Sequence, residues 1–320
     1  MQLAIDSLNA ENAPIEVLFY DSKSSSISLQ ELVQQEELQS VSLIIASFTS
    51  RNEIKPLADF AFEKNIPLIS STFPNDGGTT ANPFFALVNP TINTHIEGIY
   101  KYVHKNFPIE NILLVRKKGN MEDMIQSILL NTNENTPGIP LKLKMIELTD
   151  IFTSKQVTDN LDSTKKNIII CGTLNENFSL QLSKVLSSSK NYQVILIGMP
   201  TWDGMKDIGK GLEIIYSNPY NFSKTDKLML RLSEKYRTKY AGRPTEMVLK
   251  GYESMFHFSK LLMKHGMGII NQLSDKEFTL FNQFDFQSVK VKKENTLPDY
   301  LENKKLYFIR KIDGKIKSVN

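Results

Sequence analysis

Short apolar runs alternate with amphipathic segments along most of the chain. Runs such as 168–172 and 194–198 are continuous in Ile, Leu and Val, which is typical of strands buried on both faces of a parallel sheet. The segments between the runs carry apolar residues at helical spacing. Strands that alternate with helices predict a doubly wound α/β fold.

The same pattern gives approximate positions for the elements. The predicted strands cover residues 15–20, 43–46, 67–69, 85–88, 112–116, 143–147, 168–172, 194–198 and 212–216. The predicted helices cover residues 28–39, 53–64, 92–105, 121–131, 175–187, 226–240 and 246–265. Beyond residue 278 the pattern changes to strands, and Ile312-Asp313-Gly314-Lys315 has the sequence of a two-residue hairpin turn.

Hydroxyl side chains follow two of the predicted strands. Ser47, Thr49 and Ser50 come after strand 43–46, while Ser71 and Thr72 come after strand 67–69. In open α/β sheets, ligands bind outside the carboxyl ends of the strands. The hydroxyls therefore either contact a ligand or only cap helices.

The helix after the first of these loops has a recognisable start. Ser50-Arg51-Asn52-Glu53 matches a capping box, in which the serine accepts a bond from a helix amide and the glutamate reaches back. We expect the helix to begin at this point.

The only tryptophan, Trp202, also follows a predicted strand, 194–198. A tryptophan in such a loop offers a large rigid face to a ligand or a partner. The alternative is that its ring packs on its own domain.

Composition narrows the class of protein. The chain has 320 residues, enough for two domains, and its net charge of +3 is too small to predict a nucleic-acid partner. Its one cysteine, Cys171, ends an apolar run and reads as a buried strand residue, so an internal disulfide is excluded. No apolar stretch approaches the roughly 20 residues that span a bilayer.

Catalytic and cofactor motifs are absent from the sequence. There is no G-x-S-x-G, H-E-x-x-H or G-x-G-x-x-G, and the four histidines lack metal-ligand spacing. Residues 204–211 match the first seven positions of a phosphate-binding loop, but Gly211 stands where a hydroxyl must reach magnesium. The sequence therefore predicts no enzyme activity, no cofactor and no metal.

Several longer stretches point to a family when they are taken in order. They are SLIIASFTSRNEIKPLADFAFEKNIPLISSTF, NPFFALVNPTINTHIEGIYKYV, NILLVRKKGNMEDMIQSIL and RLSEKYRTKYAGRPTEMVLKGYESMFHFSKLL. Over nearly its whole length the chain resembles the type I periplasmic solute-binding proteins, the Leu/Ile/Val-binding-protein-like receptors. The details MPTWDG, GYES and LYFIRKIDGK look most like those of Bacteroidetes members.

The resemblance implies two lobes joined by three crossovers. Lobe one would hold residues 1–90 and 219–290, and lobe two residues 91–218 and 291–320. A small-molecule ligand would bind in the cleft between the lobes, and the hinge would close without chemistry. The implied role is that of the substrate-binding component of an ABC-type transporter, with a membrane permease as partner, in the periplasm or cell envelope.

The resemblance also implies ligand contacts, with departures from amino-acid binders. In those proteins lobe-one hydroxyls hold the ligand carboxylate, and lobe two supplies an aromatic and an acidic side chain. This chain has Asn120-Met121 and Thr201-Trp202 at the last two positions. The class of solute is left undecided by the resemblance: it is amino-acid-like, a peptide, cell-wall-derived or a sugar. The predicted contacts are Ser47, Thr49, Ser50, Ser71, Thr72, Phe73, Asn120, Met121, Thr173, Asn175, Thr201 and Trp202.

Two further expectations accompany the resemblance. The alternative function is a ligand-free scaffold of a cell-envelope regulator, bound to a cell-envelope protein, with Trp202 or Met121 filling the cleft. The family's first strand precedes the helix that begins here at Gln2. The chain is therefore expected to be N-terminally incomplete, with any export signal in the missing part.

Overall fold

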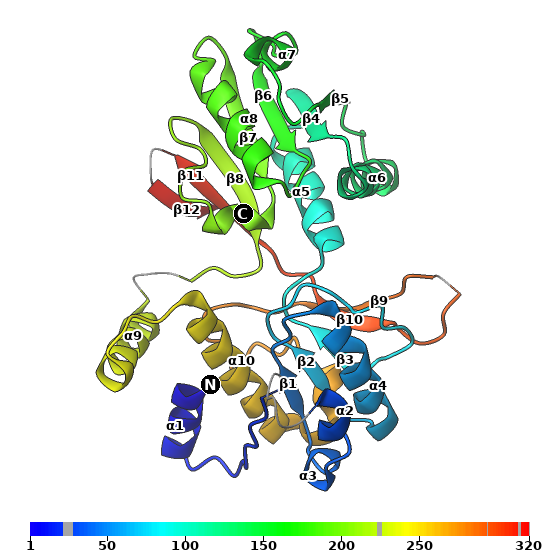
Figure 1. Ribbon diagram of the computed structural model, residues 1–320, viewed down its shortest axis with the longest axis vertical. Coiled ribbons are helices and arrows are strands. Elements are labelled where there is room, and N and C mark those ends of the chain that lie inside the picture. The colour runs from blue at the N-terminus through cyan, green and yellow to red at the C-terminus, as the bar shows by residue number, and fades with distance from the viewer. Residues whose placement is uncertain (22–27, 223–225, 293, 313–314, 320) are drawn as a thin grey trace. The chain divides into compact units, whose positions relative to one another are not determined.

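The computed structural model describes the chain except residues 22–27, 223–225, 293, 313–314 and 320. The chain forms two compact units, one of Met1–Thr91 with Asn221–Lys305 and the other of Ile92–Tyr220 with Leu306–Asn320. Each unit is a mostly parallel sheet with helices packed on it (Figure 1). The predicted α/β fold is confirmed.

The first unit is built on a sheet in the order β1-β2-β3-β10-β9, counted over the described residues. Its strands are β1 (Ile44–Ala46), β2 (Leu68–Ser70), β3 (Phe85–Leu87), β10 (Tyr300–Asn303) and the antiparallel edge strand β9 (Phe286–Val289). Its helices are α1 (Gln2–Ala10), α2 (Leu29–Leu32), α3 (Glu36–Gln39), α4 (Ile54–Lys64), α9 (Lys227–Tyr240) and α10 (Glu246–His265), with 3-10 turns η1 (Arg51–Glu53) and η3 (Gly266–Asn271).

The second unit is built on a sheet in the order β12-β11-β8-β7-β6-β4-β5, again over the described residues. Its strands are β4 (Asn111–Lys117), β5 (Leu143–Leu148), β6 (Lys166–Cys171), β7 (Gln193–Gly198), β8 (Glu213–Asn218), β11 (Tyr307–Ile312) and β12 (Lys315–Val319). Its helices are α5 (Ile92–Asn106), α6 (Asn120–Asn135), α7 (Ser154–Thr158) and α8 (Glu176–Ser188), with the 3-10 turn η2 (Pro200–Gly204).

The continuous apolar runs are explained by helices on both faces of the sheet. In β6, Ile168 and Ile170 pack into the cluster formed with α5 and α6, whereas Ile169 and Cys171 pack into the cluster formed with α8. All four side chains are fully buried. Successive strand residues point to opposite faces, so both faces must be apolar.

The predicted strand at 15–20 is wrong. These residues are described and form no strand, and Leu18 and Phe19 are 41% and 57% exposed. A strand exists only through ladder partners. The first strand of the first unit, β1, pairs with β2. Residues 15–20 join neither of the two described sheets.

The predicted helix at 28–39 is two short helices. Ser28 caps α2 through the amide of Glu31, and Gln35 is extended at the start of α3. Leu32 and Leu38 are both buried. In one helix of about 3.6 residues per turn they would lie about 120° apart, and the break lets both reach the same apolar cluster.

The boundary between the two units near the C-terminus falls at residues 305/306 and not at the expected 290/291. Residues 291–305 belong to the first unit, because β10 pairs with β3, with Leu301 opposite Ala86. The predicted hairpin turn at 313–314 lies outside the described residues. The strands beside it pair antiparallel, with Ile312 opposite Lys315.

Candidate functional site

The strand-end hydroxyls of the first unit lie together. Parallel pairing sets Ala46 of β1 opposite Ser70 of β2, so both strands end at the same edge of the sheet. Beyond that edge, Ser47 Oγ and Thr72 Oγ1 are 2.9 Å apart. Either oxygen can donate, so each hydroxyl keeps a lone pair or a proton for a ligand.

The remaining hydroxyls of this edge have different surroundings. Ser71 is buried, and its hydroxyl donates to the carbonyl of Ala46 at 2.9 Å, which makes it a structural tie. Thr49 and Ser50 are exposed. Phe73 is partly buried against the apolar cluster beneath the sheet. At this edge, therefore, Thr49 and Ser50 are open to solvent, whereas Ser71 is part of the buried structure.

Glu53 is the acidic residue of this loop. Its carboxylate accepts hydrogen bonds from the amide and the hydroxyl of Thr49, both at 2.9 Å. Burial raises the pKa of Glu53, but these hydrogen bonds outweigh it and lower the pKa below its usual value. The carboxyl group is therefore ionised at neutral pH.

The predicted capping box differs in its partners. Ser50 makes no side-chain bond to a helix amide, and Glu53 reaches back to the amide of Thr49, one residue before the N-cap. The first turn is a tight 3-10 turn.

In the second unit the strand ends of β4, β6 and β7 are neighbours. Thr173, which follows β6, is buried and donates to Glu122 Oε1 at 2.5 Å. Thr173 Oγ1 also accepts from the amide of Asn175 at 3.0 Å, and Asn175 caps α8 through the amide of Phe178. Thr173 and Asn175 therefore shape this edge from within.

Three predicted contact residues of this unit are exposed. Asn120 and Met121 begin α6, and Thr201 lies in η2. The Met121 side chain is 42% exposed. Glu122, the buried acid beside them, was not singled out from the sequence. Its position in the first turn of a helix, where a negative charge is favourable, is the signal that points to it.

Trp202 packs on its own unit. It is 2% exposed and belongs to the apolar cluster beneath β7 and β8. Its ring lies over Gly198, where an added Cβ would stand 2.0 Å from a ring carbon. Of the two interpretations of Trp202, the structure favours core packing, because the glycine makes room for the indole.

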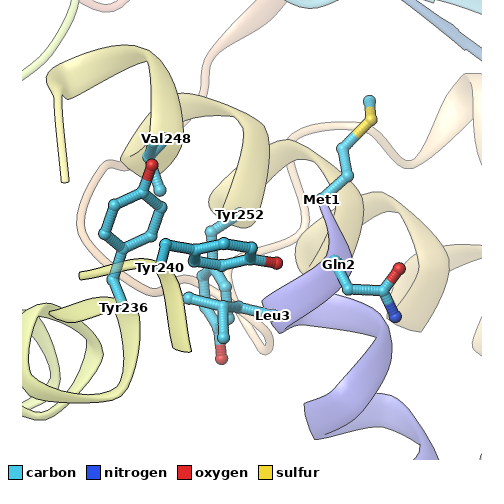
Figure 2. A pocket seen from close by; sticks show the side chains of 7 residues that line it. All are labelled: Met1, Gln2, Leu3, Tyr236, Tyr240, Val248 and Tyr252. Atoms are coloured by element: carbon cyan, nitrogen blue, oxygen red, sulfur yellow. The ribbon is translucent and has the colours of Figure 1, made fainter. Parts of the chain in front are cut away.

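A small hollow in the first unit involves none of the predicted residues (Figure 2). It lies among α1, α9 and α10 and is lined by Met1, Gln2, Leu3, Tyr236, Tyr240, Val248 and Tyr252. The rings of Tyr236 and Tyr240 are 4.8 Å apart. The tyrosines reach it from the helical layer, away from the strand-end loops.

Neither the cysteine nor any metal-ligating cluster adds a reactive group to this site, over the described residues. Cys171 is buried as predicted, and burial raises the pKa of its thiol to about 12. Over the described residues, His, Cys, Asp and Glu side chains form no group of three that could hold a metal. In the same part of the chain, every helix is too short or too polar to cross a membrane.

The comparisons with known proteins give matches among solved structures. No family model matches the sequence, and neither does any curated protein. An ABC transporter substrate-binding protein from Desulfitobacterium hafniense, in complex with Leu, has a TM-score of 0.64 at 12% identity, covering 99% of this chain and 93% of its own.

Two further structures agree with it. A putative branched-chain amino acid ABC transporter protein from Rhodospirillum rubrum has a TM-score of 0.70 at 12% identity, covering 99% of this chain and 92% of its own. The substrate-binding protein LivJ from Streptococcus pneumoniae, in complex with isoleucine, has a TM-score of 0.56 at 16% identity with the same coverage. The chain therefore has the fold of the type I periplasmic solute-binding proteins, as its sequence predicts. The likeness to Bacteroidetes members stays a prediction.

Proposed function

We propose that this protein binds a small solute without changing it chemically and delivers it to the membrane permease of an ABC-type transporter. The observation that carries this proposal is the shared fold, which covers 99% of the chain in substrate-binding proteins solved with Leu and with isoleucine. Such a role places the protein in the periplasm or cell envelope.

In this proposal the candidate solute contacts are strand-end side chains, which are exposed or, for Thr72, partly exposed. The first unit would contribute the hydroxyls of Ser47 and Thr72, and the second unit Asn120, Met121 and Thr201. Binding would shift the population of the chain toward its solute-bound conformation, without any chemical step. A non-catalytic role agrees with the burial of Cys171, whose thiol stays protonated at neutral pH.

The test is a solute titration followed by two independent signals. Trp202 is the only tryptophan and lies next to Thr201, so its fluorescence reports on one strand end of the second unit. The melting temperature is the second signal. A solute at 100 times its Kd stabilises the folded protein against unfolding by about 2.7 kcal/mol. The panel contains amino acids, short peptides, sugars and cell-wall fragments.

We expect one solute class to give a saturable change in at least the melting temperature. No response in either signal across the panel would contradict solute binding and favour the scaffold alternative.

A further inference from the structure

The loop between β1 and α4 contains a carboxylate of the chain itself. Glu53 Oε2 accepts from the amide of Thr49 and Oε1 from its hydroxyl, each at 2.9 Å. Both carboxylate oxygens of Glu53 are therefore occupied by donors of its own loop. Backbone amides and hydroxyls at the start of a helix attract anions, so Glu53 stands where an external anion would otherwise be held.

Arg51, the cation nearest in sequence, forms no ion pair with Glu53 in the described part of the chain. The guanidinium of Arg51 lies over Gly78, 3.3 Å from the point where a Cβ of that glycine would stand. Burial raises the pKa of Glu53, but the hydrogen bonds from Thr49 help to lower it below its usual value. A second carboxylate brought to this loop would meet a negative charge and donors that are already engaged.

The second unit also has a glutamate near a strand end that accepts from a threonine hydroxyl, here from the loop after another strand. Glu122, in the first turn of α6, is 7% exposed and accepts from the hydroxyl of Thr173 at 2.5 Å. Gly119 leaves room for it, since an added Cβ would lie 2.3 Å from the Glu122 carboxylate. At both strand-end edges, therefore, an internal glutamate takes up donors beside exposed neutral side chains.

We propose that Glu53 is a specificity-determining residue: it bars a solute carboxylate from the strand-end loop of the first unit. The solute then presents a neutral group there, a hydroxyl or an amide, to the paired hydroxyls of Ser47 and Thr72. This inference rests on the proposed function. It distinguishes the solute from Leu and isoleucine, which carry a carboxylate.

Acetate is the probe for the loop itself, because it is the smallest carboxylate that matches the Glu53 side chain. Three variants are compared with the unsubstituted chain in sodium acetate and in sodium chloride of equal ionic strength. Glu53→Ala removes the charge and opens the space, and Glu53→Gln removes the charge but still fills the space. Glu63→Ala removes an exposed charge near the other end of α4, where Glu63 lies 3.5 Å from Lys64.

We expect acetate to raise the melting temperature of Glu53→Ala by about 2–4 °C over chloride, the shift that about 1 kcal/mol of binding gives a domain of this size. The unsubstituted chain, Glu53→Gln and Glu63→Ala should show no difference between the two salts. If Glu53→Ala is unfolded in chloride, acetate should restore its helical circular dichroism. An equal response of Glu53→Ala to the two salts would overturn the inference.

A second measurement uses the unsubstituted chain alone. Leucine and isoleucine are compared with leucinamide and isoleucinamide, which lack the carboxylate. A preference of about tenfold or more for either amino acid over its amide would show that the carboxylate is bound, and would overturn the inference while supporting solute binding. Equal binding, tighter binding of the amide, or no response to either amino acid is the expected result. A chain that binds no solute of the whole panel would refute the proposed function, and the specificity role of Glu53 with it.

Discussion

Ser47 and Thr72 lie just beyond the ends of two neighbouring parallel strands of the first unit, and their hydroxyl oxygens are 2.9 Å apart. The two residues are 25 positions apart in the sequence and meet only because β1 and β2 pair in register. Their contact joins the side chains of two predicted contact residues from different strand ends.

Removing the Ser47 hydroxyl from this pair should weaken solute binding. Ser47→Ala and Thr72→Ser test the two positions, and Ser47→Ala should lower the affinity by about 2–10 fold, the cost of one neutral hydrogen bond. Because Ser47 is exposed, its loss should leave the melting temperature of the free protein nearly unchanged. Thr72→Ser keeps the hydroxyl and should bind like the unsubstituted protein.

The matched control is Ser40→Ala, which removes an exposed hydroxyl that donates to Glu37 in the same unit. Affinity is measured by titration with a solute identified in the panel. An equal loss in Ser40→Ala and Ser47→Ala would contradict a role for the strand-end hydroxyl.

Gly198 and Trp202 should be coupled in stability. A Cβ at position 198 would stand 2.0 Å from the indole, so Gly198→Ala should destabilise the second unit by about 1–3 kcal/mol. Trp202→Phe leaves more room, and the double variant should lose less than the sum of the two single variants. Denaturation followed by circular dichroism gives the four free energies of a double-mutant cycle, and strict additivity would contradict this packing.

Acid should destabilise the second unit through His95. The imidazole is fully buried, its Nδ1 lies 2.9 Å from Ser217 Oγ, and burial lowers its pKa to about 3. The unfolded chain binds a proton near pH 6.5 and the folded unit does not, so stability falls as the pH drops below 6.5. Between pH 7 and pH 5 this one group should remove about 2 kcal/mol.

Denaturation followed by Trp202 fluorescence measures this effect in the unit that contains His95. His95→Gln should show a smaller difference between pH 7 and pH 5, whatever its absolute stability. His104→Gln, at a partly exposed position of the same helix, serves as control. An unchanged pH difference in His95→Gln would refute this assignment.

Glu253 should be essential for the stability of the first unit. It is 1% exposed on α10, and its carboxylate accepts from the amides of Phe281 and Asn282 and from Asn282 Nδ2, at 2.6–2.9 Å. Asn282 Oδ1 in turn accepts from the amide of Asn221. Asn221 is the residue at which the chain returns from the second unit to the first.

Glu253→Ala would leave buried donors without an acceptor and should cost about 2–4 kcal/mol of unfolding free energy. Glu246→Ala changes an exposed glutamate at the start of the same helix and should cost less than about 1 kcal/mol. Chemical denaturation followed by circular dichroism compares them, and similar losses in the two variants would contradict the importance of the buried network.

The sequence by itself determined the alternation of strands and helices and the position of the hydroxyl-rich loops. The apolar runs at 168–172 and 194–198 predict strands because both faces of the sheet are covered, so every residue of such a strand must be apolar. The doubly wound class follows from that local signal, with no knowledge of which strands pair.

Tertiary structure decided what depends on distant partners. Residues 15–20 have the composition of a strand but join neither described sheet, whereas 300–303 joins the first unit through Ala86, 215 positions before Leu301. The surroundings of Trp202 depend on the space above Gly198, and the roles of Glu53 and Glu122 depend on which donors the folded loops bring to them. Periodicity reports burial, but pairing, available space and hydrogen-bond partners exist only after the chain has folded.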